Sequence, residues 1–223
     1  MTTPEPLASA HEMHGYLIGQ LNLAVRRPGM HGGEPALQML MDHLLFLERR
    51  REAWSERVRA WEERRAWTSI GVIGAFHNAF PGVFSDECSA ASVYAEFARD
   101  CGWLRPDREL TADVHAALRG TVRQWAGEDR VWADVAEEFG PPSVLIGGTN
   151  PFCGKTLAYV SEKEDDPIVS FHLWNGSTSG SWPPDHQEPL LLAVRYGDGP
   201  FRQRFTLTPE GERRLSSVTP SAR

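Results

Sequence analysis

The sequence predicts an α+β protein, with a helical N-terminal part followed by a C-terminal antiparallel sheet. Up to about residue 140 the apolar residues recur at helical spacing, and beyond Pro142 short apolar runs alternate with turn-rich pieces. Helices followed by strands, with no alternation of the two, are typical of this fold class. We expect about six helices in residues 1–140, then about five strands and a short terminal helix in residues 141–216, and a frayed tail at 217–223. The two parts are either separate domains or one compact domain.

Six segments carry the helical pattern. The first, 13–25, follows Ser9, a residue type that caps helices, and stops at an Arg-Pro-Gly sequence. The segment Glu34 to Trp67 predicts one continuous helix, roughly 50 Å long at 1.5 Å per residue. Such a helix extends beyond a small core, so a second helix or a second copy of the chain should cover its far end, and a homodimer is one alternative. The remaining predicted helices are 70–80, 88–101, 111–126 and 130–139.

Five short runs rich in Val, Leu, Ile, Phe and Tyr predict the strands of the sheet. Acidic and glycine-rich turns separate these runs. After them, Thr208-Pro209 can begin a terminal helix, with acidic residues early and arginines late, as the helix dipole favours. The predicted strands are 143–146, 156–161, 168–174, 190–196 and 201–207.

The charge and cysteine content disfavour several classes of protein. The formal net charge of −7 opposes broad attraction to nucleic acid or to anionic lipid. No basic N-terminal stretch precedes an apolar one, and no apolar run reaches the roughly 18–20 residues that span a bilayer. The three cysteines, Cys88, Cys101 and Cys153, include no C-x-x-C pair. We therefore expect a cytoplasmic protein that has no membrane span, disulfide framework, bound metal or cofactor, and for which nucleic acid is a disfavoured partner.

The stretch SVLIGGTNPFCGKTLAYV, residues 143–160, is the most motif-like part of the chain. A phosphate-binding loop needs Gly, four residues, and then Gly-Lys-Ser/Thr. Here the position that should hold the first glycine, five before Gly154, is Thr149, and Gly148 lies one residue too far away. The segments that follow are predicted strands, without the crossover helices of such nucleotide-binding proteins. We therefore interpret the stretch as a loop leading into a strand.

The connection after the predicted strand 168–174 is rich in Gly, Ser and Pro and is too long for a simple hairpin. Long ordered loops are often functional. Asp185 and His186 are adjacent in sequence and cannot form an ordinary base–orienter pair, so an acid–base site needs partners from elsewhere. No catalytic residue is assigned. The candidates for ligand or partner binding are Asn150, Lys155, His172, Trp174, Asn175, Trp182, Asp185 and His186.

The stretch YGDGPFRQRFTLTPEGERRL, residues 196–215, resembles the wing and final helix of winged-helix DNA-binding proteins. The resemblance implies a hairpin that runs into a helix, and in that family a helix-turn-helix lies just upstream. Here the preceding residues are the predicted strand 168–174 and a loop, which is a departure from the family. A DNA-binding face would have to come from Arg195, Arg202, Arg204, Arg213 and Arg214.

The stretch RRPGMHGGE, residues 26–34, resembles an Arg-Pro-Gly-Met-Tyr-x-Gly segment found near the start of type II topoisomerase ATPase domains and in uncharacterised bacterial proteins. His31 replaces the tyrosine, and no Asp-x-Gly-x-Gly nucleotide motif follows. The resemblance therefore implies no ATPase activity for this chain. Physically, the segment ends one helix and begins the next.

These observations predict a non-catalytic, protein-binding regulatory or inhibitory protein whose partner is another protein. Two alternatives stay open. One is a small-molecule enzyme with a site around the loops of the C-terminal sheet, where His172, Asn150, Lys155 or His186 would have to converge with at least one strongly shifted pKa. The other is the winged-helix-like DNA-binding regulator.

Overall fold

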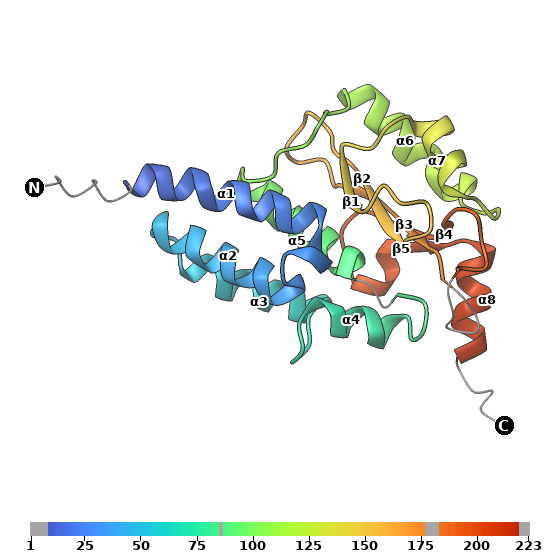
Figure 1. Cartoon of the computed structure of the whole chain (residues 1–223), viewed down its shortest axis with the longest axis horizontal. Helices are drawn as coiled ribbons and strands as arrows, with labels where there is room; N and C mark the ends of the chain where they lie inside the picture. The colour runs from blue at the N-terminus through green and yellow to red at the C-terminus, as the bar shows by residue number, and fades with distance from the viewer. Residues whose placement is uncertain (1–8, 85–86, 177–182, 219–223) are drawn as a thin grey trace, which may run out of the picture.

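The computed structural model describes residues 9–84, 87–176 and 183–218 and confirms the α+β fold (Figure 1). The helical part consists of α1 (Ala10–Arg26), η1 (Pro28–Met30), α2 (Gly33–Leu47), α3 (Glu52–Glu63), α4 (Val72–Ala79), α5 (Glu87–Asp100), α6 (Ala112–Trp125) and α7 (Trp132–Phe139). The strands are β1 (Val144–Gly147), β2 (Lys155–Tyr159), β3 (Val169–Trp174), β4 (Leu190–Arg195) and β5 (Phe205–Leu207). The short helix η2 (Phe201–Arg204) precedes β5, and α8 (Pro209–Val218) follows it.

The strands form one antiparallel sheet of five, in which each strand pairs with the next along the chain. Thr156 of β2 lies opposite His172 of β3, which lies opposite Ala193 of β4. Between His172 and Leu173 the pairing with β4 shifts by one residue, which is a β-bulge. The predicted antiparallel sheet is therefore confirmed.

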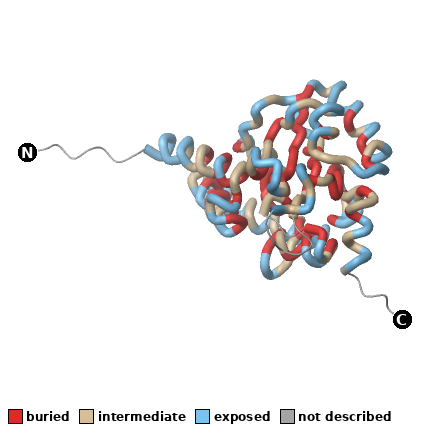
Figure 2. The backbone as a smooth tube through the Cα atoms, turned by 45° about the vertical axis from the view of Figure 1, so that its right-hand side comes forward, coloured by how far each residue is buried: buried red, intermediate tan, exposed pale blue. Residues whose placement is uncertain are grey.

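Helices cover both faces of the sheet (Figure 1). On one face, Leu157 and Phe171 share a core with Val135 of α7 and with apolar residues of α6. On the other face, Ile146 and Ala158 join a second core with residues from α1 to α5. Figure 2 shows that the buried residues are concentrated in the sheet and in the helices against it, while the residues at the N-terminal end of α1 are exposed. The strands thus supply apolar residues to two cores at once.

The predicted continuous helix 34–67 is wrong, because the chain reverses between α2 and α3. Arg49 has a left-handed backbone, with φ of 58°. Its N–H donates to the carbonyl of Phe46 at 3.1 Å, and the N–H of Arg50 donates to that of Leu45 at 2.8 Å. These two bonds close the end of α2 in the pattern that glycine usually completes. The described residues of the helical part consequently hold seven α-helices and η1, and α3 folds back toward the core.

The predicted strand 201–207 is only partly correct, since its first half is the short helix η2. The N–H of Phe201 donates to the carbonyl of Arg64 at 2.7 Å and so does not pair with β4. This bond fastens η2 to the loop that follows α3. The predicted terminal helix is confirmed as α8, which continues to Val218, whereas residues 219–223 lie outside the described part of the chain.

The carboxylate of Glu34 fixes the start of α4. It accepts the backbone N–H groups of Val72 at 2.6 Å and Ile73 at 3.0 Å, and the hydroxyl of Tyr94 at 2.5 Å. Burial, together with this negative charge, raises the pKa of Tyr94, which keeps its phenol protonated as a donor. A single side chain of α2 thereby joins α4 to α5.

A second carboxylate, that of the largely buried Glu96, joins α5 to the sheet. Arg195 of β4 and Arg204 of η2 both donate to its Oε1, the latter at 2.8 Å. Arg195 also donates to the hydroxyl of Ser92 at 2.8 Å. Burial by itself would raise the pKa of Glu96, but the charges of the two arginines outweigh this effect and lower it. The group is therefore a carboxylate shared by two guanidinium groups.

We expect Glu96→Gln to lower the free energy of unfolding by about 3–5 kcal/mol, because it leaves two buried guanidinium groups without their counter-charge. Urea unfolding followed by circular dichroism measures this change. Asp129→Asn is the matched control, since its partner Arg213 is 58% exposed and an exposed pair contributes at most about 1 kcal/mol. Equal losses in the two variants would contradict the assignment.

We expect Arg49→Gly to raise the free energy of unfolding by about 1 kcal/mol, because glycine adopts the left-handed backbone without a Cβ clash. Arg59→Gly is the control. Arg59 is exposed in the middle of α3, where glycine should cost about 1 kcal/mol. Unfolding curves that move in the same direction for both variants would show that the left-handed residue stores no strain.

Candidate functional site

Several of the predicted site residues meet at one end of the sheet. Lys155 begins β2 and Trp174 ends β3. The amide of Asn175 donates to the carbonyl of Pro151 at 3.2 Å and to that of His186 at 3.0 Å. The loop before β2 and the loop before β4 are therefore tied together through Asn175.

The remaining loop candidates lie around Trp174. The guanidinium carbon of Arg214 of α8 lies over the Trp174 ring, 3.4 Å from its centroid. The centroid of the His186 ring lies 6.2 Å from that of Trp174. The N–H of Asp185 donates to the carbonyl of Gly176 at 3.1 Å. Trp182 lies outside the described residues. These contacts join the C-terminal helix to the end of the sheet.

Lys155 is the most unusual charge in this group. Its side chain is fully buried, and Nζ donates to the carbonyl of Asn150 at 3.0 Å and lies 3.6 Å from the ring centroid of Trp132. Within the described residues no carboxylate is ion-paired with Lys155. Burial lowers the pKa of Lys155 to about 8; the charge of Arg27 acts in the same direction, while nearby thiol groups oppose it. The structure thus places Asn150 and Lys155 in contact around a poorly neutralised ammonium group.

His172 does not join this group. Neighbouring strand residues point to opposite faces, so Thr156 and its cross-strand partner His172 face away from Lys155. The hydroxyl of Thr156 lies 3.1 Å from Nδ1 of His172, whose ring packs among phenylalanines that include Phe205, at a centroid distance of 5.7 Å. Burial, assisted by the charge of Arg195, holds the pKa of His172 well below its ordinary value. A neutral core histidine fits these surroundings.

The five arginines of the winged-helix alternative do not form an open basic face. Arg195 and Arg204 are buried against Glu96. Arg213 pairs with Asp129 at 2.6 Å and with Glu210 at 2.7 Å, and Glu210 also pairs with Arg214. β4 and β5 do form a hairpin that is followed by α8, but the three elements before β4 are β1, β2 and β3. Only the local part of the resemblance is present.

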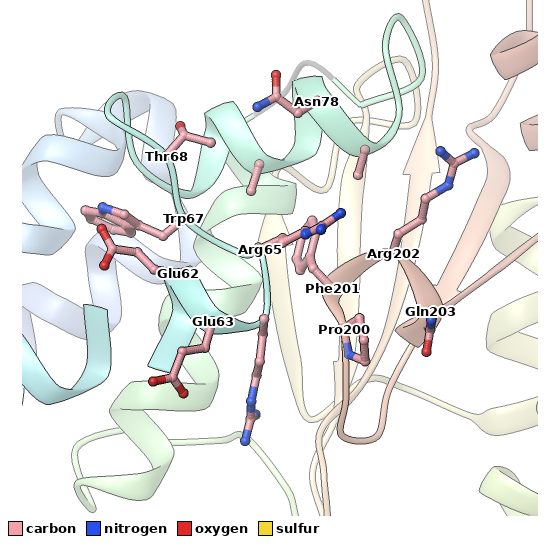
Figure 3. Close-up of a pocket in the computed structure, with 13 residues that line it drawn as sticks. Glu62, Glu63, Arg65, Trp67, Thr68, Asn78, Pro200, Phe201, Arg202 and Gln203 are labelled. Carbon is pink, nitrogen blue, oxygen red and sulfur yellow. The ribbon is translucent and has the colours of Figure 1, made fainter. Parts of the chain in front are cut away.

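A cleft of about 1000 Å³, which the sequence did not indicate, lies between three separate segments (Figure 3). Its walls are the end of α3 with the following loop, one side of α4, and η2. The charge run 62–65 falls within the predicted continuous helix 34–67, and the only sequence signal is its position before a Trp-Thr-Ser sequence. The lining residues are Glu62, Glu63, Arg64, Arg65, Trp67, Thr68, Ala75, Asn78, Ala79, Pro200, Phe201, Arg202 and Gln203.

The charges are unevenly distributed within the cleft. Figure 3 shows the guanidinium of Arg65 beside Phe201, whereas Glu62 and Glu63 extend on the other side. Arg202 reaches toward the end of α4, with Cζ 5.8 Å from the ring centroid of Phe80. The part of the cleft between α4 and η2 therefore combines an apolar floor with two arginines.

A scan against protein-family models and searches of curated proteins and of solved structures found no match to this chain. Across residues 9–84, 87–176 and 183–218, no helix combines the length and the apolar character that crossing a membrane requires. The same residues contain no group of three or more His, Cys, Asp or Glu side chains arranged to hold a metal ion. The contacts inside the molecule therefore carry the functional argument.

We expect the contribution of Lys155 to stability to depend on pH. Because its pKa is about 8 in the folded chain and 10.5 ordinarily, the unfolded chain binds more protons between these values. The free energy of unfolding should therefore rise with pH through that window in the wild type and not in Lys155→Met. Urea unfolding at intervals from pH 7 to 10.5 measures the difference.

Lys155 and Lys163 are the two lysines of the sequence, so Lys163→Met is a matched control. Lys163 is exposed, and the pH dependence of the Lys163→Met variant should follow that of the wild type. If the free energy of unfolding of the wild type stays parallel to that of Lys155→Met over the whole pH range, the pKa of Lys155 is not lowered by folding.

Proposed function

We propose that the chain is a non-catalytic binding protein that recognises a segment of a partner protein through the cleft between α3, α4 and η2. The observation that carries the proposal is the joining of an apolar floor and arginine side chains by three segments that are distant in sequence. Occupation of this cleft would change the activity of the partner, which is a regulatory or inhibitory role.

The floor of the cleft supports recognition of an apolar side chain. Ala75 is buried and Ala79 half-buried on the side of α4 that faces the cleft, and small residues there leave room beside Phe201. Phe201 is held in place by its backbone bond to Arg64 and by ring contacts with Phe76, at a centroid distance of 5.0 Å. A preformed apolar surface of this kind binds at a lower cost in conformational entropy.

The rim supports recognition of acidic groups. Arg65 and Arg202 are exposed, and neither is ion-paired with a carboxylate among the described residues. The amide side chains of Asn78 and Gln203 add neutral donors and acceptors on the same walls. Guanidinium groups bind carboxylates with two parallel hydrogen bonds. The partner segment should therefore carry Asp or Glu next to an apolar or aromatic residue.

A photo-crosslinking residue tests the proposal. We expect p-benzoylphenylalanine in place of Gln203 to form a covalent adduct with one protein from a lysate of the chain's own host, through a segment rich in Asp or Glu. The yield of the adduct should fall as the salt concentration increases, because salt screens the exposed charges that bring the two proteins together. The same amino acid in place of Glu137, which is exposed on α7, should not capture this protein.

Charge reversal at the rim gives a second readout on the captured partner. Arg65→Glu combined with Arg202→Glu should reduce capture roughly tenfold or more, as expected for losing charge-assisted hydrogen bonds. Arg59→Glu changes an exposed residue of α3 outside the lining and should leave capture nearly unchanged. Undiminished capture by the doubly reversed chain would remove the cleft from the proposed function.

A further inference from the structure

A second hollow, separate from the cleft of Figure 3, lies where the connection between α1 and α2 meets the loop between β1 and β2. Its volume is about 470 Å³. Residues 27–30 form one wall, and residues 147–150 with Gly154 form the other. Cys88, near the start of α5, lies between them. The hollow thus includes parts of both stretches that stood out in the sequence.

Arg27 brings a guanidinium group to this hollow. Among the described residues its buried Nη1 has no hydrogen-bond partner, and Arg27 takes part in none of the ion pairs there. Its neighbour Arg26 points elsewhere and pairs with Asp107 at 2.8 Å. A guanidinium nitrogen that is removed from water and left without an acceptor is costly. An anion bound in the hollow would supply a counter-charge to this guanidinium group.

Gly148 lies beside this guanidinium group. A Cβ added at Gly148 would lie 3.7 Å from Nη1 of Arg27, at ordinary contact distance. Gly147, with φ of 109°, turns the chain away at the end of β1. The remaining lining is mostly carbon and includes the buried Pro28 and the exposed Met30. An apolar body fits beside a single charged group.

The surrounding charges limit what the hollow can hold. Lys155 lies close enough for its ammonium and the guanidinium of Arg27 to repel each other. Among the described residues, the carboxylate of Glu87 lies 3.1 Å from the position of a Cβ on Gly29 and faces the start of α2. These three described groups, two cations and one carboxylate, together leave one positive charge. A monoanion therefore matches the site better than a doubly charged phosphate.

We infer that this hollow binds a small organic carboxylate, with its carboxylate on Arg27 and its apolar body against Pro28, Met30 and the glycine-rich loop. The positive charge of Lys155 adds to the attraction from behind the loop. The site is independent of the protein-binding cleft, and its ligand would be a metabolite-sized molecule with one carboxylate and a short apolar chain or ring.

The experiment is a titration of the 15N-labelled full chain with hexanoate. The NMR chemical shifts of the backbone amides of Gly29 and Gly148 monitor binding. We expect saturable shifts at both glycines with hexanoate. Hexanamide should bind at least roughly tenfold more weakly, because the amide lacks the charge that Arg27 recognises. Inorganic phosphate, which has no apolar body, should also bind more weakly. Equal binding of hexanamide and hexanoate would overturn the inference, as would the absence of shifts at Gly148.

Three variants locate the site. Arg27→Gln should weaken hexanoate binding roughly tenfold or more, and Arg26→Gln, which removes the same charge one residue away, should leave it within about twofold. Gly148→Val should abolish binding by filling the hollow. It should fold normally, since the first added carbon meets its neighbours at ordinary contact distances. Equal losses in Arg26→Gln and Arg27→Gln, or full binding by Gly148→Val, would show non-specific attraction and reject the site.

Discussion

The largely buried carboxylate of Glu96 is the constraint on which the joining of helices and sheet depends. It lies on α5, the helix that packs against α1, α2 and α4 as well as against the sheet. Its two arginine partners come from β4 and from η2, so one negative charge holds together the end of β4 and the segment that leads into β5. Because two guanidinium groups inside a protein need a counter-charge, packing arrangements that separate Glu96 from them are strongly disfavoured.

The shape of the proposed protein-binding cleft depends on two carboxylates inside the molecule. Glu34 fixes the start of α4, and Glu96 fixes η2 through Arg204. The third wall is fastened by the bond between Phe201 and the carbonyl of Arg64. The charged rim is exposed and free to rearrange, but the walls beneath it are anchored in the core. Such a division suits recognition, since rigid surfaces lose little entropy on binding while arginine side chains adapt.

The fold class, the antiparallel sheet and most helices could be predicted because each depends on apolar spacing within one segment. The reversal at Arg49 could not, since nothing in a run of Glu and Arg marks an arginine that takes the role of glycine. Glu34 and Glu96 also escaped prediction, because a lone acidic residue in an amphipathic helix gives no sign of partners from other elements. At the site, the contact of Asn150 with Lys155 follows from their closeness in sequence. The cleft of Figure 3 joins segments near residues 65, 78 and 202, and no pattern within one segment reveals such an encounter.

The sharing of one core between α1 to α5 and the sheet has a consequence for the chain during its synthesis on the ribosome. Residues up to Asp100 emerge first, while the strand residues that cover them, such as Ala158 and Leu192, come later. Glu96 waits for Arg195 and Arg204, which lie 99 and 108 positions further along the chain. At the usual pace of translation this delay lasts roughly 5–20 seconds. Over that interval the newly made helices hold an uncovered apolar face and an unpaired acidic group, so the nascent chain is the form of this protein that most needs a chaperone.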